Sequence, residues 1–175
     1  MNIIETKLPG VVIIEPTVHG DERGFFLESY QKQRYQEAGL NLEFVQDNHS
    51  RSSYGVLRGL HFQKTKPQGK LVRAVKGEVF DVAVDINPDS ATYGQYEAVI
   101  LSESNKRQFY VPPGYAHGFV VLSETADFEY KCTDYYDPTD EGGIIWNDPD
   151  IAIDWPVENP TLSAKDEKLP KLCDL

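Results

Sequence analysis

Residues 70–86 read KLVRAVKGEVFDVAVDI, and this stretch decides the fold class. Two runs rich in valine are separated by Lys76 and Gly77, a pair typical of a tight turn. We therefore predict one strand over residues 70–76 and a second over 78–86. In the second strand, period-two alternation predicts that the even-numbered residues 80–86 face the main core. The other face carries Asp81 and Asp85, and we expect it to meet solvent or a wet cavity.

The same pattern of short strands and turns continues in both directions along the chain. We expect further strands over residues 11–15, 25–30, 56–63, 96–101, 108–111, 118–122 and 126–133, a turn over 19–24, a helix over 29–39 and a short helix around 164–169. Many short strands joined by glycine and proline turns are typical of an antiparallel sandwich or barrel. The chain has 175 residues without a repeat or a long linker, so we predict a single domain over residues 1–175.

Composition restricts the classes of partner. The chain carries 17 Lys and Arg against 28 Asp and Glu, a net charge of −11, which argues against nucleic-acid binding but not against an anionic small ligand. Two cysteines, Cys132 and Cys173, are too few for a disulfide framework, so we expect a reducing, cytoplasmic setting. The apolar run at 11–14 is too short for a signal peptide or a membrane span, and we predict no membrane association.

Two histidine segments resemble the metal signature of cupins, which are small double-stranded β-helix barrels. They are RGLHFQ at 58–63 and PPGYAHGF at 112–119. Gln63 stands where the signature has its second histidine, and no glutamate follows, so only His61 and His117 remain as good ligands. Because a stable zinc or iron site needs three or more such ligands, we expect a site without metal.

Eight segments together resemble one family of metal-free cupins. In order they are DERGFFLE at 21–28, VQDN at 45–48, LRGLH at 57–61, QGKLVR at 68–73, GEVFDV at 77–82, PGYAHGF at 113–119, YKCT at 130–133 and LSAKD at 162–166. Each segment alone is a weak signal. Their order and spacing, over about residues 3 to 170, are similar to the dTDP-4-dehydrorhamnose 3,5-epimerase family.

This resemblance implies a fold and an activity. The fold would be mainly β, a cupin-type antiparallel jelly-roll barrel with a few short helices, working as a homodimer. The enzyme would invert C3 and C5 of dTDP-4-dehydro-6-deoxy-D-glucose, giving dTDP-4-dehydro-L-rhamnose for dTDP-L-rhamnose biosynthesis. It would need no metal and no nucleotide cofactor.

The resemblance also implies roles for individual residues. His61 would be the base, Asp166 its carboxylate partner, Tyr130 the proton donor and Lys70 the group beside the keto oxygen. The positions that would bind nucleotide, diphosphate or sugar are Arg23, Glu28, Gln46, Asn48, Arg58, His117, Glu141 and Lys165, with Tyr136 as the candidate to stack on the thymine. These residue types suit the chemistry, because inversion through an enolate needs proton-transfer groups on both faces of the sugar and a cation at the developing oxyanion.

Several alternatives stay open at the level of sequence. Strict alternation places Arg58 and His61 on opposite faces of one strand, so either Gly59 marks a bulge or Arg58 serves another surface. His19 stands where the family usually has an aromatic residue and could alter binding. The competing functions are an epimerase acting at C3 or C5 only, a ketoisomerase, a non-catalytic sugar-nucleotide-binding cupin and a metal-dependent cupin. Tyr130 could also be a simple core residue.

Overall fold

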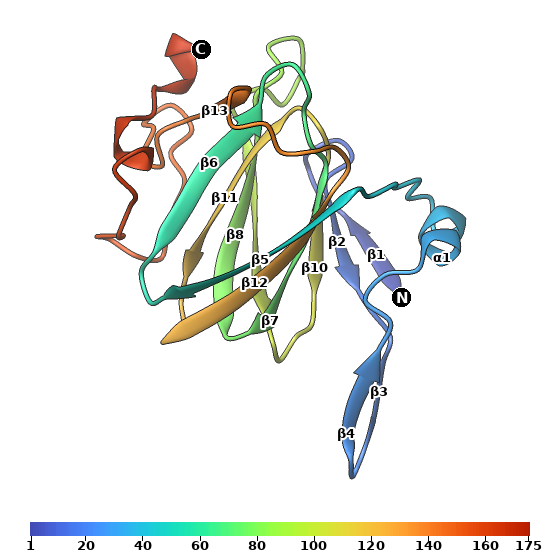
Figure 1. Ribbon diagram of the computed structural model, residues 1–175. Coiled ribbons are helices and arrows are strands. Elements are labelled where there is room, and N and C mark those ends of the chain that lie inside the picture. Colours follow the sequence, from blue (N-terminus) through green and yellow to red (C-terminus); the bar gives the residue numbers. More distant parts are fainter.

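Two antiparallel sheets face each other in the computed structural model, which describes residues 1–175 (Figure 1). The six-stranded sheet has the order β1 (Asn2–Glu5), β2 (Val12–Glu15), β10 (Gln108–Val111), β7 (Lys70–Lys76), β12 (Thr125–Cys132) and β5 (Gln46–Ser53). The five-stranded sheet has the order β13 (Glu141–Gly143), β6 (Leu57–Gln63), β11 (Tyr115–Val121), β8 (Glu78–Asp85) and β9 (Tyr96–Ser102). The predicted mainly β, antiparallel barrel is therefore confirmed.

The main core lies between the two sheets. It includes Val72 from one sheet, Val79 and Ala83 from the other, and the stacked rings of Phe119 and Phe128, whose centroids are 4.1 Å apart. Burial of these apolar side chains is the largest favourable contribution to holding the sheets together. The two halves of residues 70–86 thus belong to different sheets, although only Gly77 separates them.

This arrangement corrects the predicted faces of β8. The odd-numbered residues Val79 and Ala83 enter the main core, and Asp81 is buried with them. The even-numbered residues Val82 and Val84 face outward and lie in a second apolar cluster. Alternation separates the two faces of a strand but does not say which face another layer covers.

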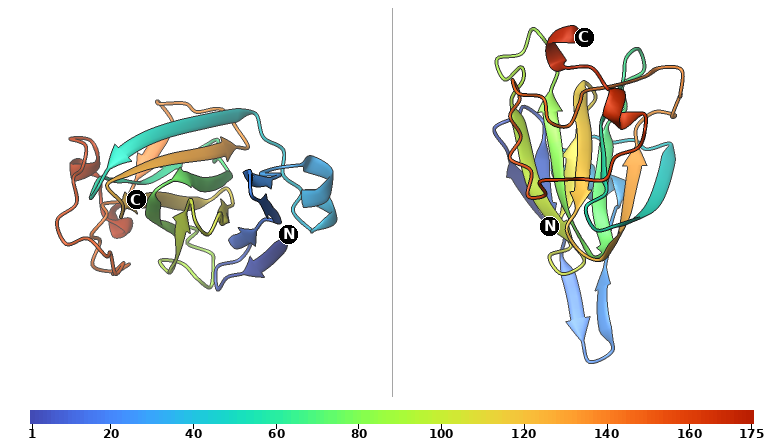
Figure 2. Two further views of the ribbon diagram at one scale, coloured as in Figure 1. Left: turned by 90° about the horizontal axis from the view of Figure 1, so that it is seen from below. Right: turned by 90° about the vertical axis from the view of Figure 1, so that its left-hand side faces the viewer.

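The layer that covers the outer face of β8 is the C-terminal segment after β13. Ile144, Ile151 and Leu172 of this segment pack against the second cluster, and it contains the short 3₁₀ helices η1 (Asp166–Lys168) and η2 (Leu172–Asp174). Figure 2 shows the segment crossing the strands of the five-stranded sheet. The loop-rich tail is therefore a third layer, and it carries Asp166.

Most strand boundaries agree with the prediction within a few residues, but four strands were missed. The missed strands are β1, β3 (Val18–Asp21), β5 and β13. The sequence of β5, QDNHSRSS, contains no large apolar residue, yet all eight of its residues pair with β12. The predicted turn over 19–24 is instead part of a hairpin made by β3 and β4 (Gly24–Leu27).

The single α-helix is shorter than predicted. It is α1 (Lys32–Glu37), and it begins where the Gln31 side chain accepts a hydrogen bond of 2.6 Å from the Arg34 N–H. Such a cap satisfies one of the free N–H groups at a helix start. No helix is long and apolar enough to span a membrane.

We predict that Gly77→Ala destabilises the fold, because Gly77 has φ +71° and an added Cβ would lie 2.2 Å from the Thr125 carbonyl oxygen. The expected loss is at least about 2 kcal/mol in the free energy of unfolding, measured by urea denaturation. Gly39→Ala is the matched control, since Gly39 has φ +89° with nothing within 4 Å of an added Cβ. It should cost only the backbone strain, about 1 kcal/mol. Equal losses in the two variants would contradict the steric explanation.

Candidate active site

A cavity opens between the two sheets, and its two lobes share three side chains. One lobe has a volume of about 410 Å³ and the other about 320 Å³. His61, Lys70 and Tyr130 line both lobes. These are three of the four residues predicted to be catalytic, and the fourth, Asp166, lines the larger lobe.

His61 on β6 is hydrogen-bonded to Asp166 of the C-terminal segment. The distance from His61 Nε2 to Asp166 Oδ1 is 2.7 Å, and the other carboxylate oxygen accepts the Gly59 N–H at 3.3 Å. The Asp166 backbone N–H donates in turn to the Ser163 hydroxyl at 3.1 Å. A carboxylate acceptor keeps the proton on Nε2, so Nδ1 carries the free lone pair of the neutral ring. The pair is therefore arranged to accept a proton at Nδ1.

The environment of Asp166 keeps its carboxylate ionised. Burial acts to raise the pKa of Asp166, but the hydrogen bond and charge of His61, the Gly59 N–H and the charge of Lys165 outweigh burial. The net pKa lies below the ordinary value of 3.8. An anion is thus available to stabilise an imidazolium when His61 takes up a proton.

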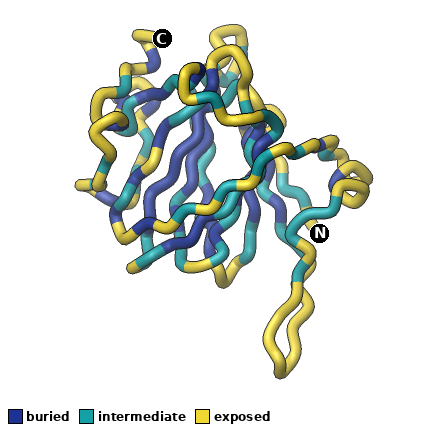
Figure 3. The backbone as a smooth tube through the Cα atoms, in the orientation of Figure 1, coloured by how far each residue is buried: buried dark blue, intermediate teal, exposed yellow.

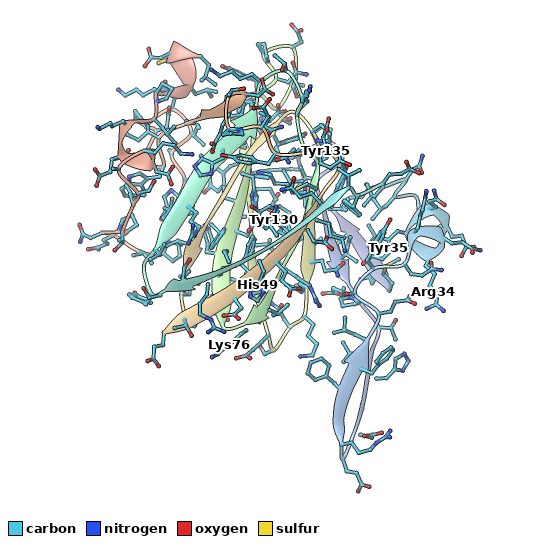
Figure 4. All side chains as sticks on the ribbon, viewed as in Figure 1. Arg34, Tyr35, His49, Lys76, Tyr130 and Tyr135 are labelled. Atoms are coloured by element: carbon cyan, nitrogen blue, oxygen red, sulfur yellow. The ribbon has the colours of Figure 1, made fainter.

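Tyr130 and Lys70 approach the cavity from the six-stranded sheet. Burial raises the pKa of Tyr130 above its ordinary value of 10.0, so its hydroxyl keeps its proton at neutral pH. Burial lowers the pKa of Lys70, which pairs in register with Cys132. Figure 4 labels Tyr130 in the middle of the molecule. Since His61 belongs to the opposite sheet, Tyr130 and His61 lie on opposite walls of the cavity.

A local irregularity in β6 brings Arg58 to the same cavity as His61. Gly59 has φ +126°, and the pairing of β6 with β11 shifts register between His117 and Phe119. Arg58 lines the larger lobe and donates from Nε to the Ser52 hydroxyl at 3.0 Å. The interpretation of Gly59 as a bulge is confirmed. An added Cβ there would lie 2.6 Å from the Gly118 Cα, so only glycine fits.

His117 forms a second histidine–aspartate pair deeper in the larger lobe. Its Nε2 lies 2.8 Å from Asp81 Oδ1, and Asp81 is fully buried with no partner for Oδ2. Burial raises the pKa of Asp81, while the neighbouring charges of His117 and Lys70 oppose this shift. The contact of Asp81 with His117 accounts for a carboxylate inside the core.

Glu141 on β13 connects the smaller lobe to His61. It accepts a hydrogen bond of 2.8 Å from the Tyr136 hydroxyl and bonds of 2.8 Å from Lys165 Nζ. Its Oε1 lies 3.9 Å from His61 Nδ1. Although burial acts to raise the pKa of Glu141, these donors and the charges of His61 and Lys165 keep it below its ordinary value. A second carboxylate therefore faces the free nitrogen of His61.

Seven of the nine predicted binding residues line the cavity. The larger lobe holds Arg58, His117 and Lys165, and the smaller lobe holds Gln46, Asn48, Tyr136 and Glu141. Together with Lys70, the cationic side chains form a local positive site in a chain of net charge −11. Such a site is complementary to an anionic group.

Arg23 and Glu28 are the two predicted binding residues that do not line the cavity of their own chain. Arg23 is at the tip of the β3–β4 hairpin, where it pairs with Asp21, and Glu28 pairs with Arg34 of α1 at 3.0 Å. His19 is exposed on the same hairpin. Figure 3 shows the hairpin projecting from the body of the molecule as an exposed arm.

Sequence reasoning missed other residues that line the cavity. They include Ser50, Phe119 and Phe128 in the larger lobe and Phe62, Gln63 and Gln68 in the smaller lobe. The signal for Ser50 was present, because it lies two residues after Asn48 and shares its face once residues 46–53 are a strand. The structure contains no group of three or more His, Cys, Asp or Glu side chains that could hold a metal ion.

Comparison with known proteins matches nearly the whole chain to a single protein family. Residues 5–174 match the family model described as dTDP-4-dehydrorhamnose 3,5-epimerase. The dTDP-4-dehydrorhamnose 3,5-epimerase of Salmonella typhimurium is 58% identical over 175 residues, which cover 98% of this chain and 96% of that protein.

Solved structures agree with the sequence relatives. The dTDP-6-deoxy-D-glucose-3,5-epimerase of Legionella pneumophila, crystallised in complex with dTDP-4-keto-L-rhamnose, is 58% identical with a TM-score of 0.95 and covers 98% of this chain and 93% of its own. The dTDP-4-dehydrorhamnose 3,5-epimerase of Bacillus anthracis, with TDP and PPi bound, is 45% identical with a TM-score of 0.95. That match covers 97% of this chain and 98% of the other.

We predict that Asp166→Asn removes a pH-dependent part of the stability. The pKa of Asp166 in the folded protein lies below the ordinary value of 3.8, which we take for the unfolded chain. The ionised carboxylate therefore contributes its full stabilisation above pH 3.8, and this contribution is lost as the pH falls through the folded pKa. Thermal unfolding of both proteins between neutral pH and pH about 3 should show the wild-type advantage shrinking in acid. A difference in melting temperature that stays constant with pH would contradict this assignment.

Proposed function

The chain belongs to the dTDP-4-dehydrorhamnose 3,5-epimerase family and epimerises C3 and C5 of dTDP-4-dehydro-6-deoxy-D-glucose, and we propose that His61 and Tyr130 carry its proton transfers. The observation that supports these roles is the placement of the two side chains on opposite walls of one cavity. Inversion requires removal of a proton from one face of a carbon and delivery from the other.

His61 acts as the base in this proposal. The C4 ketone of the substrate acidifies the hydrogens on C3 and C5, and His61 Nδ1 removes one of them because Nε2 is held by Asp166. The electron pair of the broken C–H bond moves toward C4 and gives an enolate. Asp166 stabilises the imidazolium that forms, without itself accepting the proton.

Tyr130 returns a proton from the other wall. Because burial raises the pKa of its hydroxyl, Tyr130 stays protonated until the strongly basic enolate carbon is presented to it. Lys70, which shares both lobes with His61 and Tyr130, is placed to stabilise the oxygen on which negative charge develops. His61 then releases its proton to water and Tyr130 takes one up from water, which restores both groups. The same cycle at the second carbon completes the double epimerisation.

Side chains of the larger lobe would hold the diphosphate. Arg58 and Lys165 are the cationic candidates, since each faces that lobe and a guanidinium or ammonium suits phosphate oxygens, and the His117 ring is a candidate hydrogen-bonding partner beside them. Gln46, Asn48 and Glu141 in the smaller lobe would bind the remaining polar groups of the substrate, with Tyr136 as the candidate for stacking on the thymine.

We predict that variants of His61 and Tyr130 fail at different steps. In deuterated water, proton NMR of wild type with dTDP-4-dehydro-6-deoxy-D-glucose should lose the signals at both C3 and C5. His61→Asn should abolish this exchange, a fall of at least about 10²-fold. Tyr130→Phe should still exchange hydrogen with retention, while inversion, trapped by a rhamnose-forming reductase, falls about 10²-fold or more.

Two exposed residues outside the cavity serve as controls for these variants. His49→Asn and Tyr93→Phe alter the same residue types and should keep both activities, since neither His49 nor Tyr93 lines either lobe. Near-normal exchange in His61→Asn would refute the base assignment. Equal losses of exchange and inversion in Tyr130→Phe would refute its role as the opposite-face donor.

The chain acts as a homodimer in this proposal, with the β3–β4 hairpin of each copy reaching the cavity of the other. The hairpin exposes Phe25 and Phe26, with 63% and 69% of their surfaces accessible, and it carries Arg23 away from its own cavity. Exposed neighbouring aromatic rings are typical of an interaction surface. A two-fold axis would give each cavity one hairpin from its partner.

We predict that two inactive variants restore activity when their subunits are mixed. His61→Asn lacks the base and Arg23→Ala lacks the hairpin cation, so each homodimer should be impaired. A mixed dimer would contain one cavity with His61 intact and Arg23 supplied by the other subunit. Random exchange of subunits should therefore recover about a quarter of the wild-type sites. No recovery, with subunit exchange verified by mass spectrometry of the intact dimer, would show that Arg23 acts within its own chain or not at all.

Further parts of the function stay predictions. We propose one functional domain over residues 1–175, no metal or nucleotide cofactor, and a product that enters dTDP-L-rhamnose biosynthesis. We also propose a reducing, cytoplasmic setting, as expected from a chain with only two cysteines, Cys132 and Cys173.

A further inference from the structure

We propose that Gln63 is a positioning residue that holds the loop over residues 134–137, and with it Tyr136 and Glu141, against the free nitrogen of His61. This inference rests on the proposed function of His61 as the base. The position of Gln63 in the sequence suggested only a lost metal ligand. In the structure its amide makes bonds that bear on the active site.

Side-chain amides of three glutamines hold the backbone of four consecutive residues. Gln68 donates to the Asp134 carbonyl at 2.8 Å, and Gln46 accepts the Tyr136 N–H at 2.9 Å. Gln63 uses both ends of its amide. It donates to the Tyr135 carbonyl at 3.2 Å and accepts the Asp137 N–H at 2.7 Å.

Apolar burial does not hold this loop. Tyr135 and Tyr136 expose 66% and 49% of their surfaces, whereas Gln63 exposes 5%. Figure 4 labels Tyr135 in the loop above Tyr130. Since the rings bury little surface, the position of the loop depends on its hydrogen bonds. A buried amide whose groups are all bonded fixes geometry closely, because any displacement leaves a buried polar group without a partner.

Gln63 fixes both ends of the contact between Tyr136 and Glu141. Its side chain holds the loop on either side of Tyr136, and its backbone pairs in register with Glu141 of β13. The Tyr136 hydroxyl then donates to Glu141 at 2.8 Å, and Glu141 lies 3.9 Å from His61 Nδ1. His61 itself lies two residues before Gln63 on β6. The Gln63 side chain therefore sets the position of the Tyr136 hydroxyl, which bonds the carboxylate beside the atom that accepts the proton.

A third bond ties this assembly to the turn after β6. Gln63 Nε2 also donates to the Lys66 carbonyl at 2.7 Å, so both hydrogens of the amide are used. Glutamate at this position would have nearly the same shape. It could still accept the Asp137 N–H, but its carboxylate would face two carbonyl oxygens. The geometry therefore needs an amide.

The test compares Gln63→Leu and Gln63→Glu with wild type, with and without Tyr136→Phe. Both single variants should lower kcat for exchange at C3 and C5 about 10- to 100-fold, with a smaller change in KM, because they misplace the reacting groups. In the Tyr136→Phe background, which has already lost the bond to Glu141, the further loss should be at least about fivefold smaller. Losses that multiply fully in the double variants, or no loss in the single variants, would overturn the proposal.

Controls separate positioning from folding and from the proposed function itself. Asp85→Ala removes another buried turn-holding side chain, which accepts bonds from Ser90 and Thr92 outside the cavity. Asp85→Ala should lower the melting temperature without changing kcat, both in the wild-type background and in the Tyr136→Phe background. If neither Gln63 variant folds, Gln68→Leu tests the same loop, because Gln68 is only half-buried and bonds the Asp134 carbonyl. We expect a smaller loss of kcat in this variant. An unchanged kcat would refute the proposal. Wild type that exchanges neither proton would refute the proposed function rather than this inference.

Discussion

The hydrogen bond of 2.7 Å between His61 and Asp166 joins strand β6 of the five-stranded sheet to the C-terminal segment. The two residues are 105 positions apart, so the contact forms only when the third layer has crossed the outer face of that sheet. The apolar cluster around Ile144, Ile151 and Leu172 supplies the free energy that holds this layer in place. The base is therefore oriented by a residue whose own position depends on the packing of the tail.

The antiparallel sandwich provides the second requirement of the chemistry. A carbon centre is inverted only if proton-transfer groups face it from two sides, and the two inner faces of the sheets are such sides. His61 and Tyr130 come from different sheets, and Lys70 lies on the same sheet as Tyr130. The core that holds the sheets together, through residues such as Val72 and Phe128, also sets the width of the cavity.

Charged and polar groups around the cavity are balanced locally. Two carboxylates, Asp166 and Glu141, lie near the two nitrogens of His61, and each has a pKa below its ordinary value. The positive groups, Arg58, Lys70 and Lys165, face an anionic substrate in a chain that is acidic overall. The net charge of a protein therefore says little about the sign of one site within it.

The sequence alone determined the fold class, the family and the identities of the four proposed catalytic residues. Apolar runs such as Lys70–Lys76 are local signals for strands, and the order and spacing of motifs can be read without knowing which segments contact each other. Tertiary structure decided what depends on distant partners. The polar strand β5 exists because β12 supplies its hydrogen bonds, and Val79 rather than Val82 faces the main core because the tail covers the other face. Arg23 does not line the cavity of its own chain because its hairpin projects away from the body, and Gln63 holds a loop about 70 residues later in the chain. These properties arise from contacts between segments that no local pattern records.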